Sequence, residues 1–275
     1  MLKKLLHPAV VRLKTAADRG AHDKYMNTAL PEQIRELYRR EAGKRCFIIG
    51  NGPSLKISDL DLLQKEDCFA CNRIYGVFEK TNWRPKYYCA QDARVLAQIK
   101  DELSIAIDNC EYAFLPYNFR KMYPVSVMSR SNLCLFYHPY VSVYSQNGKY
   151  PEGLMPFSDD VSSRIYDGLS ITYGMIQIAV YLGYTEIYLV GIDHNYAMKN
   201  GVVDGSQSYA EGIRPIDMST QFPPELLLCE ISYREARRYC EANEIKIQNA
   251  TRGGKLEVFE RASLDYLLNN QEEIK

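Results

Sequence analysis

The fold is indicated most strongly by Ile48-Ile49-Gly50-Asn51-Gly52-Pro53-Ser54-Leu55, an apolar run that passes into a glycine-rich turn. The apolar residues predict a buried strand, and Pro53 or Ser54 is expected to begin a helix. Glycines let the backbone approach a ligand closely, and the free N–H groups of a helix start favour a phosphate. We therefore expect a strand, a turn and a helix with a ligand at the turn; the alternative is a tight turn without one. The stretch is neither a Walker loop nor a complete G-x-G-x-x-G, so it does not by itself indicate ATP or NAD.

Outward from this stretch, β-rich runs alternate with helical patterns, which is typical of a parallel sheet with crossover helices. Strands are expected at residues 46–49, 68–71, 87–90, 112–115, 186–190 and 246–248. Helices are expected at residues 60–64, 93–103, 171–182, 224–243 and 264–268. The expected fold class is α/β: a Rossmann-like, open, mainly parallel sheet with helices on both faces.

Two long segments interrupt the alternation. Residues 117–168 are rich in Tyr, Ser, Asn and Pro, and residues 194–224 are rich in Gly, Asp, Ser and Pro. Both follow a predicted strand, at the edge where open α/β sheets bind ligands, and loops this long are usually lids or insertions. We expect a basic helical extension over residues 1–44 and a Rossmann-like nucleotide-binding catalytic domain over residues 45–270 that carries both insertions.

The charge balance is uneven along the chain. Its 275 residues include 34 Lys+Arg and 34 Asp+Glu, and 46% are hydrophobic, which excludes a disordered or fibrous protein. Zero net charge also excludes a protein that mainly covers nucleic acid. Residues 1–45, however, hold eleven Lys or Arg against five Asp or Glu, so the charge of +6 there is cancelled by −6 in the remainder.

The start of the chain bears on localisation. Arg12 and Lys14 interrupt the first apolar run and no small-residue cleavage site follows, so the chain is not expected to carry a signal peptide. No run approaches the ~20 apolar residues that span a bilayer. The expected location is cytoplasmic. The basic N-terminal extension is expected to pack on its own domain or on a partner chain; the alternative is peripheral contact with the anionic inner-membrane face.

The eight cysteines are dispersed, as expected for free thiols in a reducing compartment. Cys68 and Cys71 form a C-x-x-C, but the sequence lacks a second pair and its four histidines are scattered. Structural zinc sites need four ligands, so we expect no metal site at this motif.

Polar residues follow several other predicted strands. Asn72 follows the second, Gln91-Asp92 the third, Gly191-Ile192-Asp193 the fifth, and Arg252-Gly253-Gly254 comes after the sixth. Such residues also end strands with no further role. Because the carboxyl ends of parallel strands share one edge, their joint occurrence predicts a ligand site. The two aspartates are candidates for holding a divalent cation or acting as a base, and Arg252 for receiving a diphosphate.

The sequence resembles two related families. Gly50-Asn51-Gly52-Pro53-Ser54-Leu55, Cys71-Asn72, Ser170-Ile171-Thr172-Tyr173-Gly174 and residues 182–193 are similar to the bacterial lipooligosaccharide sialyltransferases. Those enzymes bind a CMP-activated nonulosonic acid, without a metal, in a Rossmann-like domain beneath a flexible lid. The ending Asn249-Ala250-Thr251-Arg252-Gly253-Gly254 resembles bacterial proteins grouped with the archaeal 6-hydroxymethylpterin diphosphokinases. Together the resemblances cover residues 45–270 in separate blocks.

The sialyltransferase resemblance implies roles for individual residues. It implies that Asn51 and Ser54 lie near the nucleotide phosphate, Asn72 near the nucleoside or sugar, Gln91 near the sugar or acceptor, and Thr172 and Tyr173 near the cytidine or donor carboxylate. Tyr196 and Tyr209 match tyrosines that support the departing phosphate. The donor site expected in full comprises Gly50, Asn51, Gly52, Pro53, Ser54, Asn72, Gln91, Asp92, Thr172, Tyr173, Gly174, Gly191 and Arg252.

The general base departs from the sialyltransferase pattern. Those enzymes use a lid histidine, and this chain has none between Tyr196 and its last residue. A base must reach the acceptor hydroxyl, and histidine suits that role near neutral pH. The candidates are His194, Asp193, His138 and Asp217, and we favour His194 because it directly follows Asp193 at the expected active edge.

Three functions fit these observations. The favoured one is a glycosyltransferase that takes a sugar from a nucleotide-activated, CMP-linked donor to a glycan or lipid-linked acceptor in surface glycan biosynthesis, with no firm cofactor. The alternatives are an ATP-dependent pterin-type diphosphokinase that requires Mg²⁺, and a non-catalytic nucleotide- or sugar-binding module. A homo-oligomer is expected because most soluble oligomers are symmetric homo-oligomers.

Overall fold

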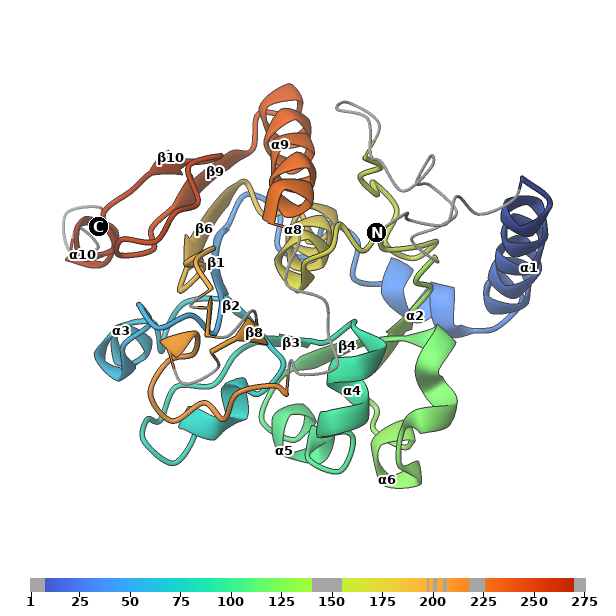
Figure 1. Cartoon of the computed structure of the whole chain (residues 1–275), viewed down its shortest axis with the longest axis horizontal. Coiled ribbons are helices and arrows are strands. Elements are labelled where there is room, and N and C mark those ends of the chain that lie inside the picture. The colour runs from blue at the N-terminus through green and yellow to red at the C-terminus, as the bar shows by residue number, and fades with distance from the viewer. Residues whose placement is uncertain are drawn as a thin grey trace.

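The fold rests on one open sheet of parallel strands, as expected from the sequence (Figure 1). The computed structural model describes residues 8–139, 155–196, 198–199, 202–204, 207–217 and 226–269. Within these ranges eight strands pair in the order β10-β9-β6-β1-β2-β3-β4-β5, and every pairing is parallel. The strands are β1 Arg45–Ile49, β2 Cys68–Cys71, β3 Tyr87–Cys89, β4 Tyr112–Pro116, β5 Leu133–Phe136, β6 Glu186–Val190, β9 Lys246–Asn249 and β10 Glu260–Arg261. A separate antiparallel pair joins β7 Met198–Lys199 to β8 Val202–Val203.

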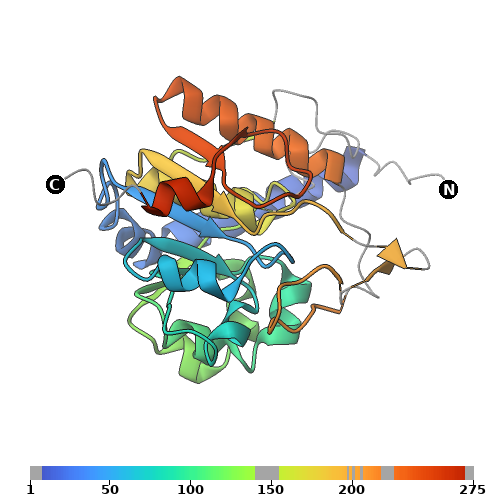
Figure 2. The ribbon, with the colours of Figure 1, turned by 90° about the vertical axis from the view of Figure 1, so that its left-hand side faces the viewer.

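Helices cover both faces of the sheet, so its central strands are buried on both sides and read as continuous apolar runs. The helices are α1 Pro8–Met26, α2 Leu30–Arg35, α3 Ile57–Leu62, α4 Ala93–Ile99, α5 Leu103–Ile107, α6 Val125–Met128, α8 Ile171–Leu182, α9 Leu226–Ala242 and α10 Leu264–Asn269, with 3₁₀ turns η1 Ile74–Val77 and η2 Tyr117–Met122. Apolar residues of α2, α8 and α9 pack on one face, and those of α3, α4, α5, α6 and α10 on the other. Figure 2 shows these two layers from the side.

The strand order reverses beside β1. From β1 the chain builds the sheet outward in one direction through β2, β3, β4 and β5. It then returns through α8 to β6, which pairs with the opposite side of β1. The connections after β1 and β6 therefore diverge, and such a switch point opens a crevice at the carboxyl edge of the sheet.

The segment before β1 packs on the domain. Tyr25 and Ile34 are fully buried, and the Tyr25 hydroxyl donates to the Ser162 carbonyl at 2.9 Å. The Tyr137 hydroxyl donates to an Asp18 carboxylate oxygen at 2.7 Å. From Asp18 onward the basic N-terminal region therefore contacts its own domain. No described helix is both long and apolar enough to cross a bilayer. Peripheral membrane contact and the boundary at residues 44–45 stay predictions.

Two local expectations were wrong. No helix begins at Pro53 or Ser54; α3 begins at Ile57, because the Ser54 hydroxyl donates to Asp193, 139 residues away, and holds the preceding loop out of a helix. Residues 133–136, expected within an insertion, form the edge strand β5 and pair with β4. This apolar run of four residues is short and stands in a Tyr- and Pro-rich context, which hid it in the sequence.

Candidate functional site

A cavity lies at the switch point between the carboxyl ends of β1 and β6. Its volume is about 130 Å³, the space of roughly four water molecules, which suits a phosphate-sized group. It is lined by Gly50, Asn51, Gly52, Pro53, Cys71, Asn72, Ser170, Ile171, Thr172, Gly191, Ile192, Asp193, His194, Asn195, Tyr196, Ser208, Tyr209 and Tyr233. Segments far apart in the sequence therefore converge on one small polar space.

Close backbone approach explains the glycines of the first turn. Gly50 N–H donates to Val190 O at 2.8 Å, and Gly52 N–H donates to Gly191 O at 3.0 Å. A Cβ on Gly50 would overlap the Gly191 carbonyl, and one on Gly52 would overlap the Asp193 carboxylate. Only glycine lets the turn after β1 lie directly against the turn after β6.

Asn51 presents an unused acceptor at this turn. Its Nδ2 donates to Cys71 O at 3.1 Å, and its backbone carbonyl accepts from Ala210 N–H at 2.9 Å. Its Oδ1 is buried and has no hydrogen-bond partner among the described residues. Buried polar atoms are nearly always paired, so this oxygen is available to a donor group on a ligand.

The start of α8 points at the same cavity. Ser170 is its N-cap and accepts from Thr172 N–H at 3.3 Å, while the Ser170 Oγ and the Tyr233 hydroxyl share a hydrogen bond of 2.7 Å. The first turn of α8 contains no acidic residue. The positive end of the helix dipole therefore faces the cavity, and no acidic side chain of that turn offsets it, which favours an anion there.

Burial shifts the pKa values of Asp193 and His194 in opposite directions. Burial raises the pKa of Asp193, although hydrogen bonds from Ser54, including one of 2.8 Å to Oδ2, act in the opposite direction. Burial lowers the pKa of His194, and Glu230, whose Oε1 lies 3.5 Å from His194 Nε2, partly opposes this. His194 has a left-handed φ of 50°. An imidazole with a lowered pKa is neutral at pH 7 and can accept a proton.

Two of the predicted tyrosines lie in the cavity wall. Burial raises the pKa of Tyr196 and of Tyr209, so both hydroxyls stay protonated at neutral pH. A protonated phenol donates a hydrogen bond to an anionic oxygen. Tyr209 belongs to the segment of residues 207–217, which folds back over the glycine turn through the bond between Ala210 and Asn51.

Among the expected site residues, Gly50, Asn51, Gly52, Pro53, Asn72, Thr172, Gly191, Asp193, His194, Tyr196 and Tyr209 line the cavity. Ser54 does not line the cavity, but its hydroxyl donates a hydrogen bond to Asp193, which does. Their roles in catalysis or donor binding stay predictions.

Other expected residues lie away from the cavity lining. Gln91 Nε2 donates to an Asp167 carboxylate oxygen at 2.9 Å, and Gly174 lies beside the Oε1 of Gln91. Asp92 caps α4 by accepting from Arg94 N–H at 2.7 Å. The buried hydroxyl of Tyr173 donates to Pro156 O at 2.9 Å.

Arg252 and the two remaining base candidates also have structural partners. Arg252 pairs with Asp59 at 2.5 Å and with Asp265 at 2.6 Å, so its guanidinium is already engaged. His138 Nδ1 lies 3.3 Å from Ile165 O, and the Asp217 N–H donates to Gln98 Oε1 at 2.8 Å. None of these three residues lines the cavity.

Sequence reasoning missed Tyr233 and Glu230. Both belong to α9, three residues apart, so they share one face of that helix. Tyr233 lines the cavity and Glu230 contacts His194. Their spacing indicates a shared helix face, but nothing in the sequence indicates that this face contacts α8 and the turn after β6.

The two aspartates expected to hold a divalent cation have other partners in the structure. No group of three His, Cys, Asp or Glu side chains gathers among the described residues in a way that could hold a metal ion. Asp92 is used as a helix cap and Asp193 is bonded to Ser54.

The family model of the 6-hydroxymethylpterin diphosphokinase MptE-like proteins matches residues 22–199. The chain belongs to the MptE-like family. This confirms the resemblance to the diphosphokinase group, and the match includes β1, α8 and β6, which form the cavity. A comparison with curated proteins finds no match.

Solved structures of transferases show a low similarity to this chain. The MAf glycosyltransferase from Magnetospirillum magneticum AMB-1 is 16% identical with a TM-score of 0.48; the alignment covers 89% of this chain and 38% of that one. This chain therefore spans well under half of that protein. The sialyltransferase CstII from Campylobacter jejuni, solved with cytidine-5′-monophosphate, is 19% identical over 81% of this chain and 86% of its own, with a TM-score of 0.45. The monofunctional α-2,3-sialyltransferase Cst-I from the same organism is 17% identical over 82% and 78%, with a TM-score of 0.41.

Proposed function

We propose that this MptE-like protein is a glycosyltransferase that uses a nucleotide-activated, CMP-linked sugar donor in surface glycan biosynthesis. The observation that carries the proposal is the N-terminus of α8, whose first turn has no acidic residue, facing a phosphate-sized cavity beside the unpaired Oδ1 of Asn51. The resemblance to sialyltransferases in the four sequence blocks supplies the donor class. A glycan or lipid-linked acceptor is part of the proposal.

The chemistry assigned to the cavity is a displacement at the sugar carbon. The acceptor hydroxyl loses its proton to neutral His194, its oxygen bonds to that carbon, and the bond from the carbon to the phosphate oxygen breaks. The negative charge left on the phosphate is stabilised by the N-terminus of α8 and by hydrogen bonds from Tyr196 and Tyr209. Asn51 accepts a hydrogen bond from the donor and fixes its orientation.

A pterin-type diphosphokinase is the second candidate, favoured by the description of the family that matches. It transfers a diphosphate from ATP and needs Mg²⁺ held by convergent carboxylates. The local hydrogen bonds of Asp92 and Asp193 argue for the glycosyltransferase instead.

A thermal-shift series with CMP, CDP, UDP and ATP, each with and without Mg²⁺, separates the two functions. A ligand at one hundred times its Kd adds about 2.7 kcal/mol to the free energy of unfolding. For a chain of this size the melting temperature then rises by roughly 5–10 °C. We expect CMP to raise it without Mg²⁺. Stabilisation by ATP with Mg²⁺ alone would refute the glycosyltransferase and support the kinase.

Asn51→Ala tests the site itself. We expect the variant to fold, because it loses one hydrogen bond worth about 1 kcal/mol, but to lose the CMP-dependent shift and the hydrolysis of CMP-linked donor. Asn82→Ala, at an exposed asparagine outside the cavity, is the matched control and keeps both. A non-catalytic binding module would instead bind CMP without ever hydrolysing a donor.

A further inference from the structure

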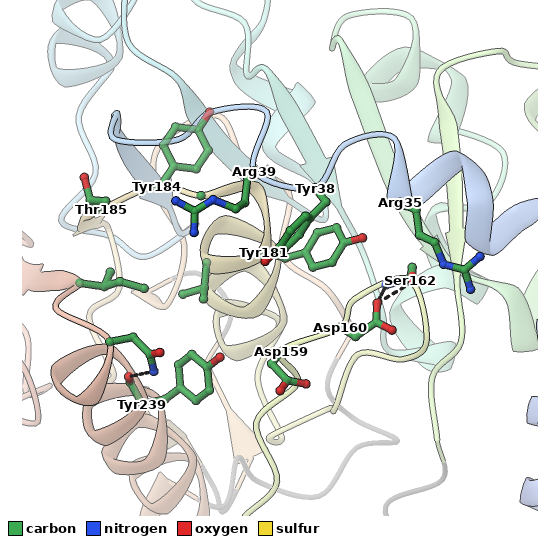
Figure 3. A pocket seen from close by; sticks show the side chains of 14 residues that line it. Arg35, Tyr38, Arg39, Asp159, Asp160, Ser162, Tyr181, Tyr184, Thr185 and Tyr239 are labelled. Carbon is green, nitrogen blue, oxygen red and sulfur yellow. Dashed lines mark hydrogen bonds between the residues drawn. The ribbon is translucent and has the colours of Figure 1, made fainter.

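A second and larger hollow lies at the amino edge of the sheet, the edge opposite the candidate site. It forms where α8 ends, where β6 and β9 begin, and where the segment after α2 crosses them (Figure 3). Its volume is about 780 Å³, within the range of small-molecule sites. We call this hollow the amino-edge groove.

Tyrosines form much of its wall. The rings of Tyr38 and Tyr181 lie 5.1 Å apart between centroids, and Tyr38 is 57% exposed. Tyr239 is held by stacking on Phe157 at 4.2 Å between centroids. In Figure 3, Tyr38 and Tyr181 lie along one side of the groove and Tyr239 along the other. Each ring offers a flat apolar face and a hydroxyl at its tip.

Two charged side chains in the groove have no hydrogen-bond or ion-pair partner among the described residues. Within the ranges that the structure describes, Arg39 and Asp159 have no side-chain hydrogen bond or ion pair, whereas Arg35 pairs with Glu32 at 2.7 Å. Arg39 approaches from the side of Tyr38, and Asp159 from the side of Tyr239 (Figure 3). The groove thus offers a planar donor group and a planar acceptor group on opposite walls.

The backbone of Arg39 is strained where it enters the groove. Its φ is 53°, in the left-handed region that residues with a Cβ rarely adopt. Its N–H donates to Tyr181 O at 3.1 Å, near the end of α8. Strain of this kind is found preferentially at binding sites, where it aims a side chain.

Charge excludes some ligand classes. The groove lies at the carboxyl end of α8, the negative end of its dipole, and the last turn contains no basic residue. Asp159 and Asp160 add two carboxylates, whereas Arg39 is the one arginine among the described lining residues whose charge is not already paired, because Arg35 pairs with Glu32. A nucleotide phosphate is therefore disfavoured. Flat rings together with planar donor and acceptor groups suit a molecule with apolar C–H faces and many hydroxyls.

We propose that the amino-edge groove binds an uncharged saccharide. The rings of Tyr38 and Tyr239 pack on the sugar faces, and Arg39 and Asp159 hydrogen-bond adjacent hydroxyls. The groove lies at the other end of α8 from the cavity, and twelve residues at 1.5 Å each separate the two by about 18 Å. Its occupant is therefore not the reacting sugar, and the proposal stands without the transferase activity.

Saturation-transfer NMR and titration calorimetry with chitotriose, maltotriose and mannotriose test this site. We expect the wild-type chain to bind at least one trisaccharide. Arg39→Gly should weaken that binding at least about tenfold. Glycine accepts a positive φ, so this variant removes the guanidinium while relieving backbone strain and is expected to fold. Tyr38→Ala, at an exposed ring, should have a similar effect.

The controls locate the site. Arg40→Gln changes the neighbouring exposed arginine, which does not line the groove, and should leave trisaccharide binding unchanged. Arg39→Gly should keep the CMP-dependent thermal shift, which separates this inference from the proposed function. The proposal is overturned if no trisaccharide binds the wild-type chain, or if binding survives both Arg39→Gly and Tyr38→Ala.

Discussion

At the scale of single residues, His194 and Glu230 form the most informative pair. The pKa of His194 is lowered by burial and raised by the Glu230 carboxylate beside it. In the unfolded chain a histidine has its ordinary pKa of about 6.5. Between that pH and the lower pKa of the folded state, the unfolded chain binds more protons than the folded one. The contribution of neutral His194 to stability is therefore present above pH 6.5 and is lost as the pH falls.

The same pair predicts a pH profile. His194→Gln should lower the transfer rate by roughly 10²–10⁴-fold and remove the acidic limb of the kcat/KM profile, because the base is gone. Glu230→Gln should keep most activity but move that limb to lower pH, because the pKa of His194 falls further without the carboxylate. Glu241→Gln, elsewhere on α9 and paired with Arg237, is the control. An unchanged limb in Glu230→Gln would exclude His194 as the base.

At the scale of elements, the end of β9 supports the turn after β6. The Thr251 hydroxyl accepts from Ile192 N–H at 3.1 Å, and Thr251 N–H donates to Asn249 Oδ1 at 3.0 Å. The Asn-Ala-Thr motif thus acts in positioning the cavity wall. Thr251→Val keeps the shape but leaves the Ile192 N–H unpaired, at a cost of about 1–3 kcal/mol.

Thr251→Val should therefore lower the melting temperature by roughly 2–12 °C. Differential scanning calorimetry measures this, and Thr185→Val, at an exposed threonine, should change it little. Equal melting temperatures for the two variants would contradict the role given to Thr251.

The segment of residues 207–217 is held by hydrogen bonds and an ion pair to α4 and to the residues just before η1 and α5. Gln98 on α4 bonds both the N–H and the carbonyl of Asp217, Arg73 donates to the Pro215 carbonyl, and Glu102 pairs with Arg214. A Cβ on Gly76 would lie 2.5 Å from the Gly212 carbonyl. These contacts hold Tyr209 in the cavity wall.

Gly76→Ala should consequently displace this segment and weaken CMP binding at least about tenfold, measured by calorimetry. Gly20→Ala is the matched control, since a Cβ on Gly20 meets no atom within 4 Å and Ala is the better helix former. Unchanged affinity in Gly76→Ala would show that the segment does not contribute to the site.

At the scale of the whole molecule, the six inner strands of the sheet were predictable, whereas its two edge strands, β5 and β10, and part of the site were not. Runs such as Glu186–Val190 form strands because of their own apolar residues, and these strands begin and end within a residue or two of the expected positions. The start of α3 depends on Asp193, and the contact of Glu230 with His194 depends on how α9 docks. Such long-range contacts leave no periodic pattern, which is why sequence reasoning missed them.

The sheet also explains the cysteines. Cys68 and Cys71 stand three residues apart in β2, so their side chains belong to opposite core layers and cannot form one chelate. Burial raises the pKa of the Cys71 and Cys134 thiols to about 12. All eight cysteines are free, and all but Cys110 are buried.

A thiol reagent should therefore label at most Cys110 rapidly in the native protein and all eight cysteines in denaturant. Labelling followed by mass spectrometry checks this. Two or more rapidly modified thiols in the native state would contradict the burial of the sheet.

The reversal of strand order beside β1 has a further consequence, for folding. Arg45 of β1 pairs with Glu186 of β6, which emerges from the ribosome 141 residues later. At 5–20 residues per second, β1 keeps one edge unpaired for roughly 7–30 s of synthesis. An apolar strand with a free edge is a template for pairing with other chains. Chains truncated before β6 should therefore aggregate, although they contain five strands of the sheet.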